Sequence, residues 1–379
     1  MSLALTEEQE LLRNTAREFI AEHSPVKELR RLRDTNDPVG FSRELWKQMA
    51  ELGWAGITLP EELGGADLGY AELGLVLEEC GRTLTASPLV STVLLGANAL
   101  LLAGNGAQQK DLLGAVAKGE IVLALALQEG PHHAPYQVAT KAEPTVDGFK
   151  LTGKKTFVLD GHVADQLVVV ARSAGAPGDR DGLGLFLVEK GARGLAVKRT
   201  SMVDGRNAAN VTLDSVEVDK SACVGQPGRG ADVLDPVLDR ATIGQAAELL
   251  GTVVEAFERT VAYLKTRTQF GVPIGSFQAL KHRAANMFTE VELSRSIVLD
   301  ALRAIDEKRP DVALLASIAK ARVSDTAQLV SNEAVQMHGG IGVTDEEEIG
   351  LFLKRARVAE LSFGDGNYHR ARFATLSGF

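Results

Sequence analysis

The spacing of hydrophobic residues changes twice along the 379-residue chain, and this change limits the possible folds more than any other feature. In the first third, apolar residues recur at the spacing of an α-helix. In the middle they form short β-branched or alternating runs, separated by Gly, Pro, Asp and Asn. The helical spacing then returns. We therefore predict an α+β chain with an N-terminal α-helical domain (1–119), a middle β domain (120–226) and a C-terminal α-helical bundle domain (227–379).

The N-terminal third carries recognisable helix-start signals. Thr6 is a good N-cap, and Gln9, three residues later, completes a capping box. Ser42 is predicted to begin a second helix, which Gly53 ends. Further helical patterns cover Tyr70–Cys80, Ser91–Ala103 and Gln108–Lys118.

The middle third predicts a sheet made of short strands. Asp147-Gly148 is a strong signal for a hairpin turn. No long helical pattern separates the strands, which favours an antiparallel sheet or barrel over a βαβ array. The predicted strands are Ile121–Leu127, Val138–Ala142, Phe149–Val158, Leu167–Arg172, Leu183–Glu189, Leu195–Thr200 and Val211–Val218.

The C-terminal third consists of long helical patterns with few breakers. Such helices usually pack as an antiparallel bundle, so we predict a four-helix bundle here. The predicted helices are Ala231–Thr266, Phe277–Lys308, Val312–His338 and Glu346–Arg357.

Composition excludes several classes of function. Lys and Arg total 41 against 50 Asp and Glu, a net charge of −9, which disfavours a nucleic-acid-binding protein. The 2 cysteines form neither a disulfide framework nor a four-ligand zinc site, and we expect no metal. Apolar stretches such as Leu94–Ala103 are too short to cross a bilayer, and the N-terminus shows no signal peptide. We expect a cytoplasmic protein of enzyme size.

The segment Gly148–Lys155 nearly matches a phosphate-binding P-loop. Lys155 stands where that motif needs Ser or Thr, and the segment lies on a predicted hairpin with no helix start to bind phosphate. We therefore expect only an exposed lysine on a strand.

The first specific motif is the stretch Arg267–Gln278, a non-helical insert between two long helices. Arg267 is suited to phosphate, because its guanidinium makes paired, charge-assisted hydrogen bonds. A nearby Phe can cover an adenine face, and Gln amides can bind ribose or phosphate oxygens. The alternative is an ordinary helix connection that carries a surface arginine.

The second motif is Gln336–Thr344, in which Gly339, Gly340 and Gly342 end a long helix. Glycines allow a ligand to approach the backbone closely and leave amide groups accessible. The alternative is a glycine-rich helix C-cap.

In this order, the two motifs resemble those of the acyl-CoA dehydrogenase family, and the similarity extends over essentially the whole chain. The loop Leu59–Gly65 and the strand segment Gly153–Val158 support it. The resemblance implies a flavoprotein that removes the α-hydrogen of an acyl-CoA as a proton and the β-hydrogen as a hydride to FAD, giving a 2-enoyl-CoA. It also implies an electron-transfer flavoprotein as partner and a tetramer with FAD at subunit interfaces.

The resemblance also assigns cofactor-binding residues. Arg267 should meet the FAD pyrophosphate, and Gln269, Phe270 and Gln278 belong to the same stretch. Three further groups complete the implied set: Gln336, Gly339 and Gly340, which would line the adenosine and pyrophosphate path from the partner chain, Leu125, Leu127, Gln128 and Phe157 beside the isoalloxazine, and Asp365 and Asn367 near the C-terminus.

The catalytic base departs from the usual family pattern. Phe363 occupies the position of the usual Glu and cannot accept a proton. The isovaleryl-type members place their base before an Arg on an earlier helix, and that position is Asp239, followed by Arg240. We therefore expect Asp239 to be the base. The alternatives are a helix-surface Asp paired with Arg240, and Asp365 as the base.

Two more departures leave the activity open. Gly130–Pro135 replaces the usual run after the flavin-contacting segment, and a Ser that often touches CoA is missing. The segment Phe363–Arg370 resembles a subgroup of bacterial enzymes for steroids and other bulky acyl groups, some of which are heterotetramers. The hypotheses are an acyl-CoA dehydrogenase using Asp239, an FAD-presenting subunit without a base that works in a heterotetramer, and a relative with other flavin chemistry such as desulfination.

Overall fold

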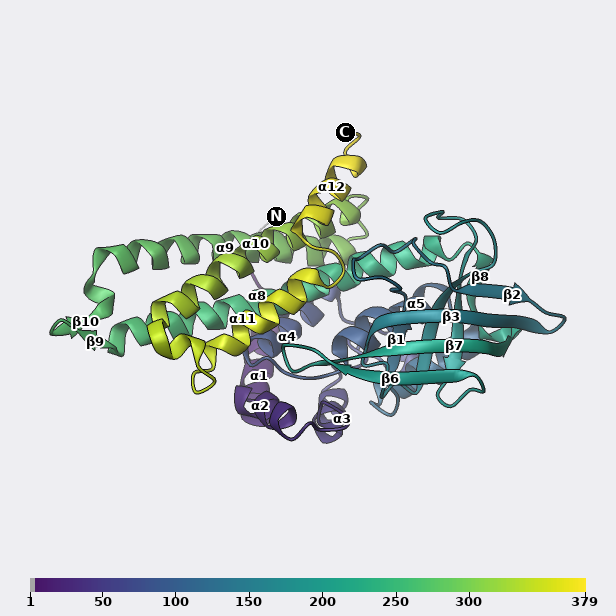
Figure 1. Cartoon of the computed structure of the whole chain (residues 1–379), viewed down its shortest axis with the longest axis horizontal. Helices are drawn as coiled ribbons and strands as arrows, with labels where there is room; N and C mark the ends of the chain where they lie inside the picture. The colour runs from purple at the N-terminus through teal and green to yellow at the C-terminus, as the bar shows by residue number, and fades with distance from the viewer. Residues whose placement is uncertain (1–3) are drawn as a thin grey trace. The chain divides into compact units, whose positions relative to one another are not determined.

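The computed structural model describes residues 4–379 and divides into two compact units (Figure 1). We call them the helical unit and the sheet unit. The helical unit comprises residues 4–31, Gly69–Thr85 and Thr242–Phe379, and the sheet unit comprises Leu32–Leu68 and Ala86–Ala241. The α+β architecture is confirmed: helices come first, a sheet follows, and a helical bundle ends the chain.

The helical unit has long helices at its centre. In Figure 1, α9 and α10 lie side by side, and α10 also packs on α11 and α12, as expected for a bundle. The helix α8, Ala231–Thr266, begins in the sheet unit and continues into the helical unit. The other helices are α1 (Glu7–His23), α4 (Tyr70–Arg82), α9 (Gln278–Asp306), α10 (Val312–His338), α11 (Ile349–Leu361) and α12 (Gly366–Leu376), and α2 (Val26–Asp34) ends in the sheet unit.

The predicted helix starts are confirmed. The Thr6 hydroxyl accepts the Gln9 amide at 3.2 Å, and the Gln9 side chain accepts the Thr6 amide at 3.1 Å, so α1 begins with a capping box. Ser42 accepts the amide of Leu45 at 3.1 Å and begins α3, Arg43–Glu51. Local capping chemistry was therefore sufficient to place both starts.

Two glycines let α4 and α8 approach closely. A Cβ atom on Gly81 would lie 1.9 Å from the Glu248 carbonyl oxygen, and one on Gly251 would lie 1.8 Å from that of Glu78. Neither position has room for a side chain. Arg82 adds ion pairs from α4 to Glu255 and Glu258 of α8.

The sheet unit contains an eight-stranded sheet in the order β6-β7-β3-β2-β4-β5-β8, with β1 paired to β4. The strands are β1 (Leu123–Ala126), β2 (Lys141–Pro144), β3 (Gly148–Leu159), β4 (Gln166–Arg172), β5 (Leu183–Glu189), β6 (Leu195–Ser201), β7 (Asn207–Asp219) and β8 (Cys223–Gly228). All seven predicted strands are present, and β8 is additional. The hairpin at Asp147-Gly148 joins β2 to β3.

The expected sheet type needs a correction. The sheet is mixed rather than antiparallel, because β1 and β2 both pair with β4 in parallel. It is also not closed, so the barrel alternative is wrong: β6 and β8 stand at opposite ends of the strand order. β1 is buried along its whole length, and such a strand carries no alternation that would reveal its neighbours.

Short helices complete the sheet unit. The run predicted as one helix from Ser91 is instead a π-helix, η2 (Leu89–Ala97), which packs on β1 and continues as α5 (Asn98–Ala103). The segment predicted over Gln108–Lys118 is divided into α6 (Gly106–Gln108), η3 (Gln109–Leu113) and α7 (Gly114–Ala117). The remaining 3-10 turns are η1 (Glu61–Leu63) and η4 (Lys220–Ala222).

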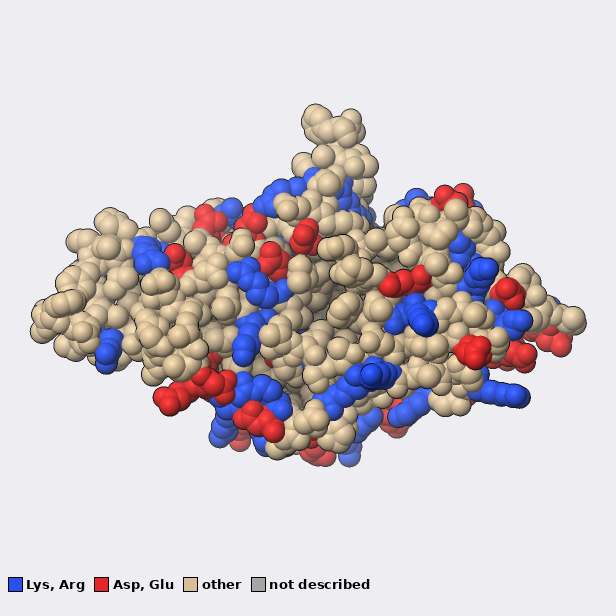
Figure 2. Space-filling model, in the orientation of Figure 1, with Lys and Arg blue, Asp and Glu red and all other residues tan. Residues whose placement is uncertain are grey.

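On the face shown in Figure 2, basic and acidic side chains are interspersed rather than gathered by sign. Among the described residues, no helix is long and apolar enough to cross a membrane. In the same residues, no three His, Cys, Asp or Glu side chains are grouped as metal ligands.

Candidate functional site

The stretch after α8 is the short hairpin labelled at the left end of Figure 1. Strand β9 (Thr268–Gln269) pairs with β10 (Val272–Pro273), and η5 (Ile274–Ser276) leads into α9. Phe270 and Gly271 form the tip with φ of 55° and 79°, the left-handed pair that a tight hairpin requires. The predicted non-helical insert is therefore confirmed.

The hairpin presents the predicted cofactor residues to solvent. The side chain of Phe270 is 91% exposed, which is unusual for a large aromatic residue. Arg267, Gln269 and Gln278 are exposed as well. One cationic, two amide and one aromatic side chain are therefore not packed in the protein core and are accessible to a ligand.

The glycine-rich motif lies at the same end of the helical unit. Tyr263 on α8 donates its hydroxyl to the His338 carbonyl at 3.2 Å, and the two rings stack 4.4 Å apart. The Arg267 amide donates to the Tyr263 carbonyl at 2.9 Å. Because His338 directly precedes Gly339, this contact brings the two predicted motifs together.

The backbone beyond α10 is open to a ligand. A Cβ atom added at Gly339 or at Gly340 would meet no atom within 4 Å. Gly339 has φ of 67°, and it begins the 3-10 turn η6, Gly339–Val343. Gln336, one turn earlier on α10, is exposed. The open backbone at Gly339 and Gly340 fits close approach by a phosphate-containing ligand.

The turn between α11 and α12 holds Phe363 in a strained conformation. Its φ is 59°, in the left-handed region, and its carbonyl accepts a hydrogen bond from His369 Nε2 at 2.9 Å. Lys320 on α10 is fully buried, and its ammonium group donates to the carbonyls of Ala359 and Glu360, near the end of α11, at 2.6 and 2.9 Å. Burial lowers the pKa of Lys320 to about 7.

Asp365 and Asn367 follow this turn in the sequence, at the start of α12. One Asp365 oxygen accepts the amide of Tyr368 at 2.8 Å, so this carboxylate is the N-cap of α12. Asn367 is exposed and accepts a hydrogen bond from Arg370 at 3.4 Å. The helix cap already engages one of the Asp365 oxygens.

In the sheet unit, the predicted flavin contacts lie on two neighbouring segments. Leu125 in β1 and Leu127 just beyond it are buried, and the Gln128 carbonyl accepts the Thr156 amide at 2.7 Å. Phe157 follows with φ of 52° and is 49% exposed. The β3–β7 register shifts between Lys155 and Val158, which marks a bulge that turns Phe157 outward.

The structure corrects the expectation of an exposed lysine at position 155. Lys155 is 0% exposed, and its Nζ donates to the Leu127 carbonyl at 3.1 Å and to Glu129 Oε1 at 2.7 Å. Burial lowers its pKa to about 8. Period-2 alternation from the buried Leu151 places Lys155 on the inner face of β3, a signal that the sequence already contained.

Asp239 lies on the part of α8 that belongs to the sheet unit. It is 7% exposed, unlike an aspartate on a solvent-facing helix surface. Arg240, the next residue, donates to the Pro236 carbonyl at 3.0 Å one turn earlier. A buried carboxylate can act as a general base where a substrate proton comes within its reach.

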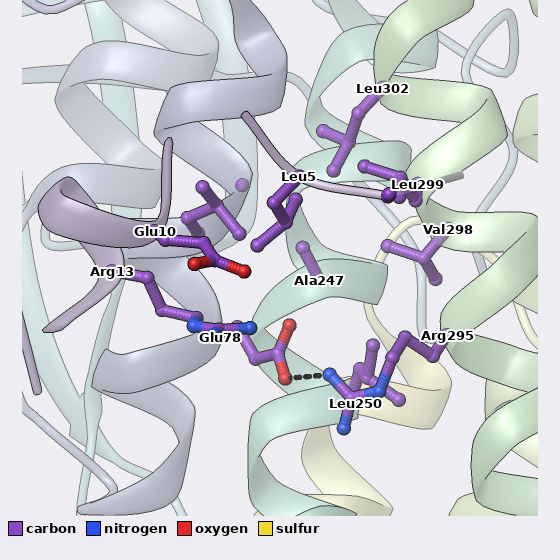
Figure 3. Close-up of a pocket in the computed structure, with 13 residues that line it drawn as sticks. Leu5, Glu10, Arg13, Glu78, Ala247, Leu250, Arg295, Val298, Leu299 and Leu302 are labelled. Atoms are coloured by element: carbon purple, nitrogen blue, oxygen red, sulfur yellow. Dashed lines mark hydrogen bonds and ion pairs between the residues drawn. The ribbon is translucent and has the colours of Figure 1, made fainter. Parts of the chain in front are cut away.

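A separate cavity of ≈ 280 Å³ lies inside the helical unit (Figure 3). Leucine and valine side chains form much of its wall, together with an ion pair between Glu78 and Arg295. Figure 3 shows Glu10 and Arg13 reaching into the cavity from α1. Its lining contains none of the predicted site residues, so the cavity is distinct from the candidate site.

Known proteins are similar to this chain over nearly its whole length. Three family models cover the chain: the N-terminal domain of acyl-CoA dehydrogenase at residues 6–120, its middle domain at 128–216 and its C-terminal domain at 228–376. Isovaleryl-CoA dehydrogenase, mitochondrial, of Pongo abelii is 32% identical, over 97% of this chain and 88% of that protein. The chain belongs to the acyl-CoA dehydrogenase family. It is therefore an oxidoreductase of a family whose cofactor is FAD.

Two solved structures share the whole fold. A chain from the study of the electron transferring flavoprotein of Acidaminococcus fermentans superposes with a TM-score of 0.93 at 30% identity, over 100% of both chains. A chain of the Tcur3481-Tcur3483 steroid ACAD, a variant, gives 0.88 at 32% identity, over 98% of both. The open glycine backbone and exposed Arg267 fit the family cofactor's pyrophosphate chemically.

Proposed function

We propose that this chain catalyses the α,β-dehydrogenation of an acyl-CoA thioester to the 2-enoyl-CoA with FAD, using Asp239 as the base. The observation that carries the proposal is the Tyr263–His338 contact, which joins the two cofactor motifs at one end of the helical unit. We retain the three-domain division at residues 119 and 226 as part of this proposal, together with a cytoplasmic location.

The proposed binding roles follow from the side chains available. Arg267 would pair with the pyrophosphate, while Gln269, Gln278 and Gln336 offer amides. Phe270 offers an exposed ring for stacking. Leu125, Leu127, Gln128 and Phe157 would flank the isoalloxazine, and Asp365 and Asn367 would contact the cofactor near α12.

The chemistry requires a base and a polarised thioester. The α-proton of a thioester is weakly acidic, and it becomes removable where hydrogen bonds stabilise the developing oxyanion and a base lies against the α-carbon. When bound, the flavin supplies the hydride acceptor. Asp239 is one methylene shorter than Glu, so this chain must hold the substrate closer to α8 than a Glu base would require.

The test of the base is Asp239→Asn. We expect the rate of flavin bleaching by a competent acyl-CoA to fall by roughly 10²–10⁴-fold, with unchanged FAD content, because the amide cannot accept the proton. Asp232→Asn, an exposed aspartate of the same helix, is the control and should bleach at the wild-type rate. An Asp239→Asn rate near wild type would exclude Asp239 as the base.

We further propose an electron-transfer flavoprotein as electron acceptor and a tetramer as the assembly. Support comes from two similar structures, one from a study of an electron transferring flavoprotein and one of a two-protein steroid enzyme. The latter, together with Phe363, favours a bulky, lipid-like or steroid acyl group. A panel of acyl-CoA thioesters monitored by flavin bleaching identifies the substrate.

Phe363 also favours a second candidate function, an FAD-presenting subunit that is inactive without a related partner. Expressing the chain alone separates the two. Yellow protein that bleaches with an acyl-CoA supports the homotetrameric enzyme. Yellow protein that responds to no thioester until a partner subunit is added supports the heterotetramer.

A further inference from the structure

We infer that Lys155 is a positioning residue: its buried ammonium group fixes the segment after β1 against the bulge of β3 and thereby sets where the flavin-ring contacts of this chain lie. The inference rests on the proposed function, because it takes Leu127, Gln128 and Phe157 as contacts of the isoalloxazine. It adds a residue that touches neither the cofactor nor the substrate in that proposal.

The first step of the argument is the placement of the lysine. Its Nζ reaches the Leu127 carbonyl at 3.1 Å and Glu129 Oε1 at 2.7 Å, on either side of Gln128. The ammonium thus holds two points of a three-residue segment. Charge-assisted hydrogen bonds of this kind are stronger and more directional than neutral ones.

The second step is the anchoring of Glu129. Its carboxylate also accepts the amides of Ala139 and Thr140, at 2.7 and 3.0 Å. Burial alone would raise the pKa of Glu129, but the Lys155 charge and these hydrogen bonds outweigh it and lower that pKa. Glu129 is therefore a fixed anion, and it ties Lys155 to the chain that leads into β2.

The third step is the strain beside the lysine. Phe157, two residues later, has φ of 52°, which is a rare conformation for a bulky residue. Between them, the Thr156 amide donates to the Gln128 carbonyl at 2.7 Å. This hydrogen bond couples the position of Phe157 to the segment that Lys155 holds. A shift of that segment would therefore displace Phe157.

The fold alone does not require a charge at this position. An apolar side chain of similar volume would fill the inner face of β3 without the desolvation cost of an ammonium group. Lys154, the neighbour on the outer face, shows that a lysine here can instead be solvated. The Lys155–Glu129 ion pair is costly to bury, and it fixes the position of the segment after β1. Such a pair fits a role in function rather than in stability.

Three variants test the inference, all in the full-length chain loaded with FAD. The double variant Lys155→Met with Glu129→Gln removes both charges, so that no lone charge is left buried. Lys155→Arg keeps the charge and displaces the donor atoms. Lys154→Met is the matched control, since it removes the adjacent exposed lysine.

We expect both position-155 variants to bind FAD about tenfold more weakly, to shift the visible flavin absorption band and to be reduced more slowly by acyl-CoA, since the two hydrogen bonds of the Lys155 ammonium are lost or misplaced. Lys154→Met should match wild type in all three. If a folded position-155 variant matches Lys154→Met, Lys155 has no positioning role. If neither variant folds, the charge is required by the fold itself, and the inference of a functional role is overturned. A wild-type protein that binds no FAD overturns the proposed function itself, which separates the two failures.

Discussion

At the scale of single residues, three phenylalanines share an unusual backbone conformation. Phe157, Phe270 and Phe363 have φ of 52°, 55° and 59°, and each lies in a motif assigned to the site. A left-handed conformation costs roughly 1–2 kcal/mol for a residue with a side chain. Such strain persists where surrounding contacts enforce it, and it concentrates at functional positions.

Arg267 is the residue on which cofactor binding depends most. Arg267→Ala should weaken FAD binding by roughly 10–100-fold, because a paired, charge-assisted contact with phosphate is lost. Fluorescence titration of the apoprotein measures the affinity. Lys265→Ala removes an exposed charge from the same helix end and should leave it unchanged. An Arg267→Ala protein with full affinity would contradict the assignment.

Phe363 offers a gain-of-function test. In the Asp239→Asn background, Phe363→Glu places a carboxylate where the family usually has its base, and should restore flavin bleaching at least tenfold over the single variant. Phe363→Gln has the same shape without a basic oxygen and should restore none. Equal rates for Glu and Gln would show that position 363 does not face the substrate.

At the scale of elements, the close contact of α4 with α8 makes a sharp prediction for stability. Gly251→Ala forces a methyl group into the Glu78 carbonyl, so the helices must separate, at a cost of about 3 kcal/mol or more. Chemical denaturation should show a clearly lowered midpoint. Gly106→Ala, in open space at the start of α6, should stay within about 0.5 kcal/mol of wild type.

Elements with an apolar stripe or a capping motif were predictable from the sequence. The helices α8 and α10 have the predicted ends. The helix α2 was missed because most of its nine residues are charged, and α12 because it begins with Gly and has a weak apolar face. Parallel pairing of β1 with β4 could not be predicted, because it depends on tertiary packing rather than on local pattern.

At the scale of the whole molecule, a buried lysine in the helical unit makes stability depend on pH. The pKa of Lys320 is about 7 in the folded protein and 10.5 for an ordinary lysine. Between these values the unfolded chain holds a proton that the folded chain has released, so raising the pH stabilises the fold.

Lys320→Met should lack this dependence. From pH 7 to 9, the stability of wild type relative to Lys320→Met should therefore rise, by up to about 2 kcal/mol. Thermal unfolding of both proteins across this range measures the difference, and Lys155 contributes equally to both. A difference that stays constant with pH would show that Lys320 keeps its ordinary pKa.

The candidate site was only partly predictable at this scale. The sequence indicated Arg267, Gly339 and their motifs, because charge and glycine content are visible in a linear pattern. The roles of Tyr263 and His338 in joining them were not predicted, since that contact links residues far apart in the chain. Lys155 was predicted to be exposed but is buried. The alternation of side chains along β3 already indicated the buried face of the strand.

The complete burial of Lys155 and Lys320 has a chemical consequence for an enzyme of thioesters. An amine attacks a thioester carbonyl only in its unprotonated form, and burial lowers the pKa of both lysines, so more of each amine is in that form near neutral pH. The closed β3 and α10 surroundings shield both amines, whereas Lys154 stays open to acylation. An acyl mark on either buried lysine would therefore record that its part of the fold had opened.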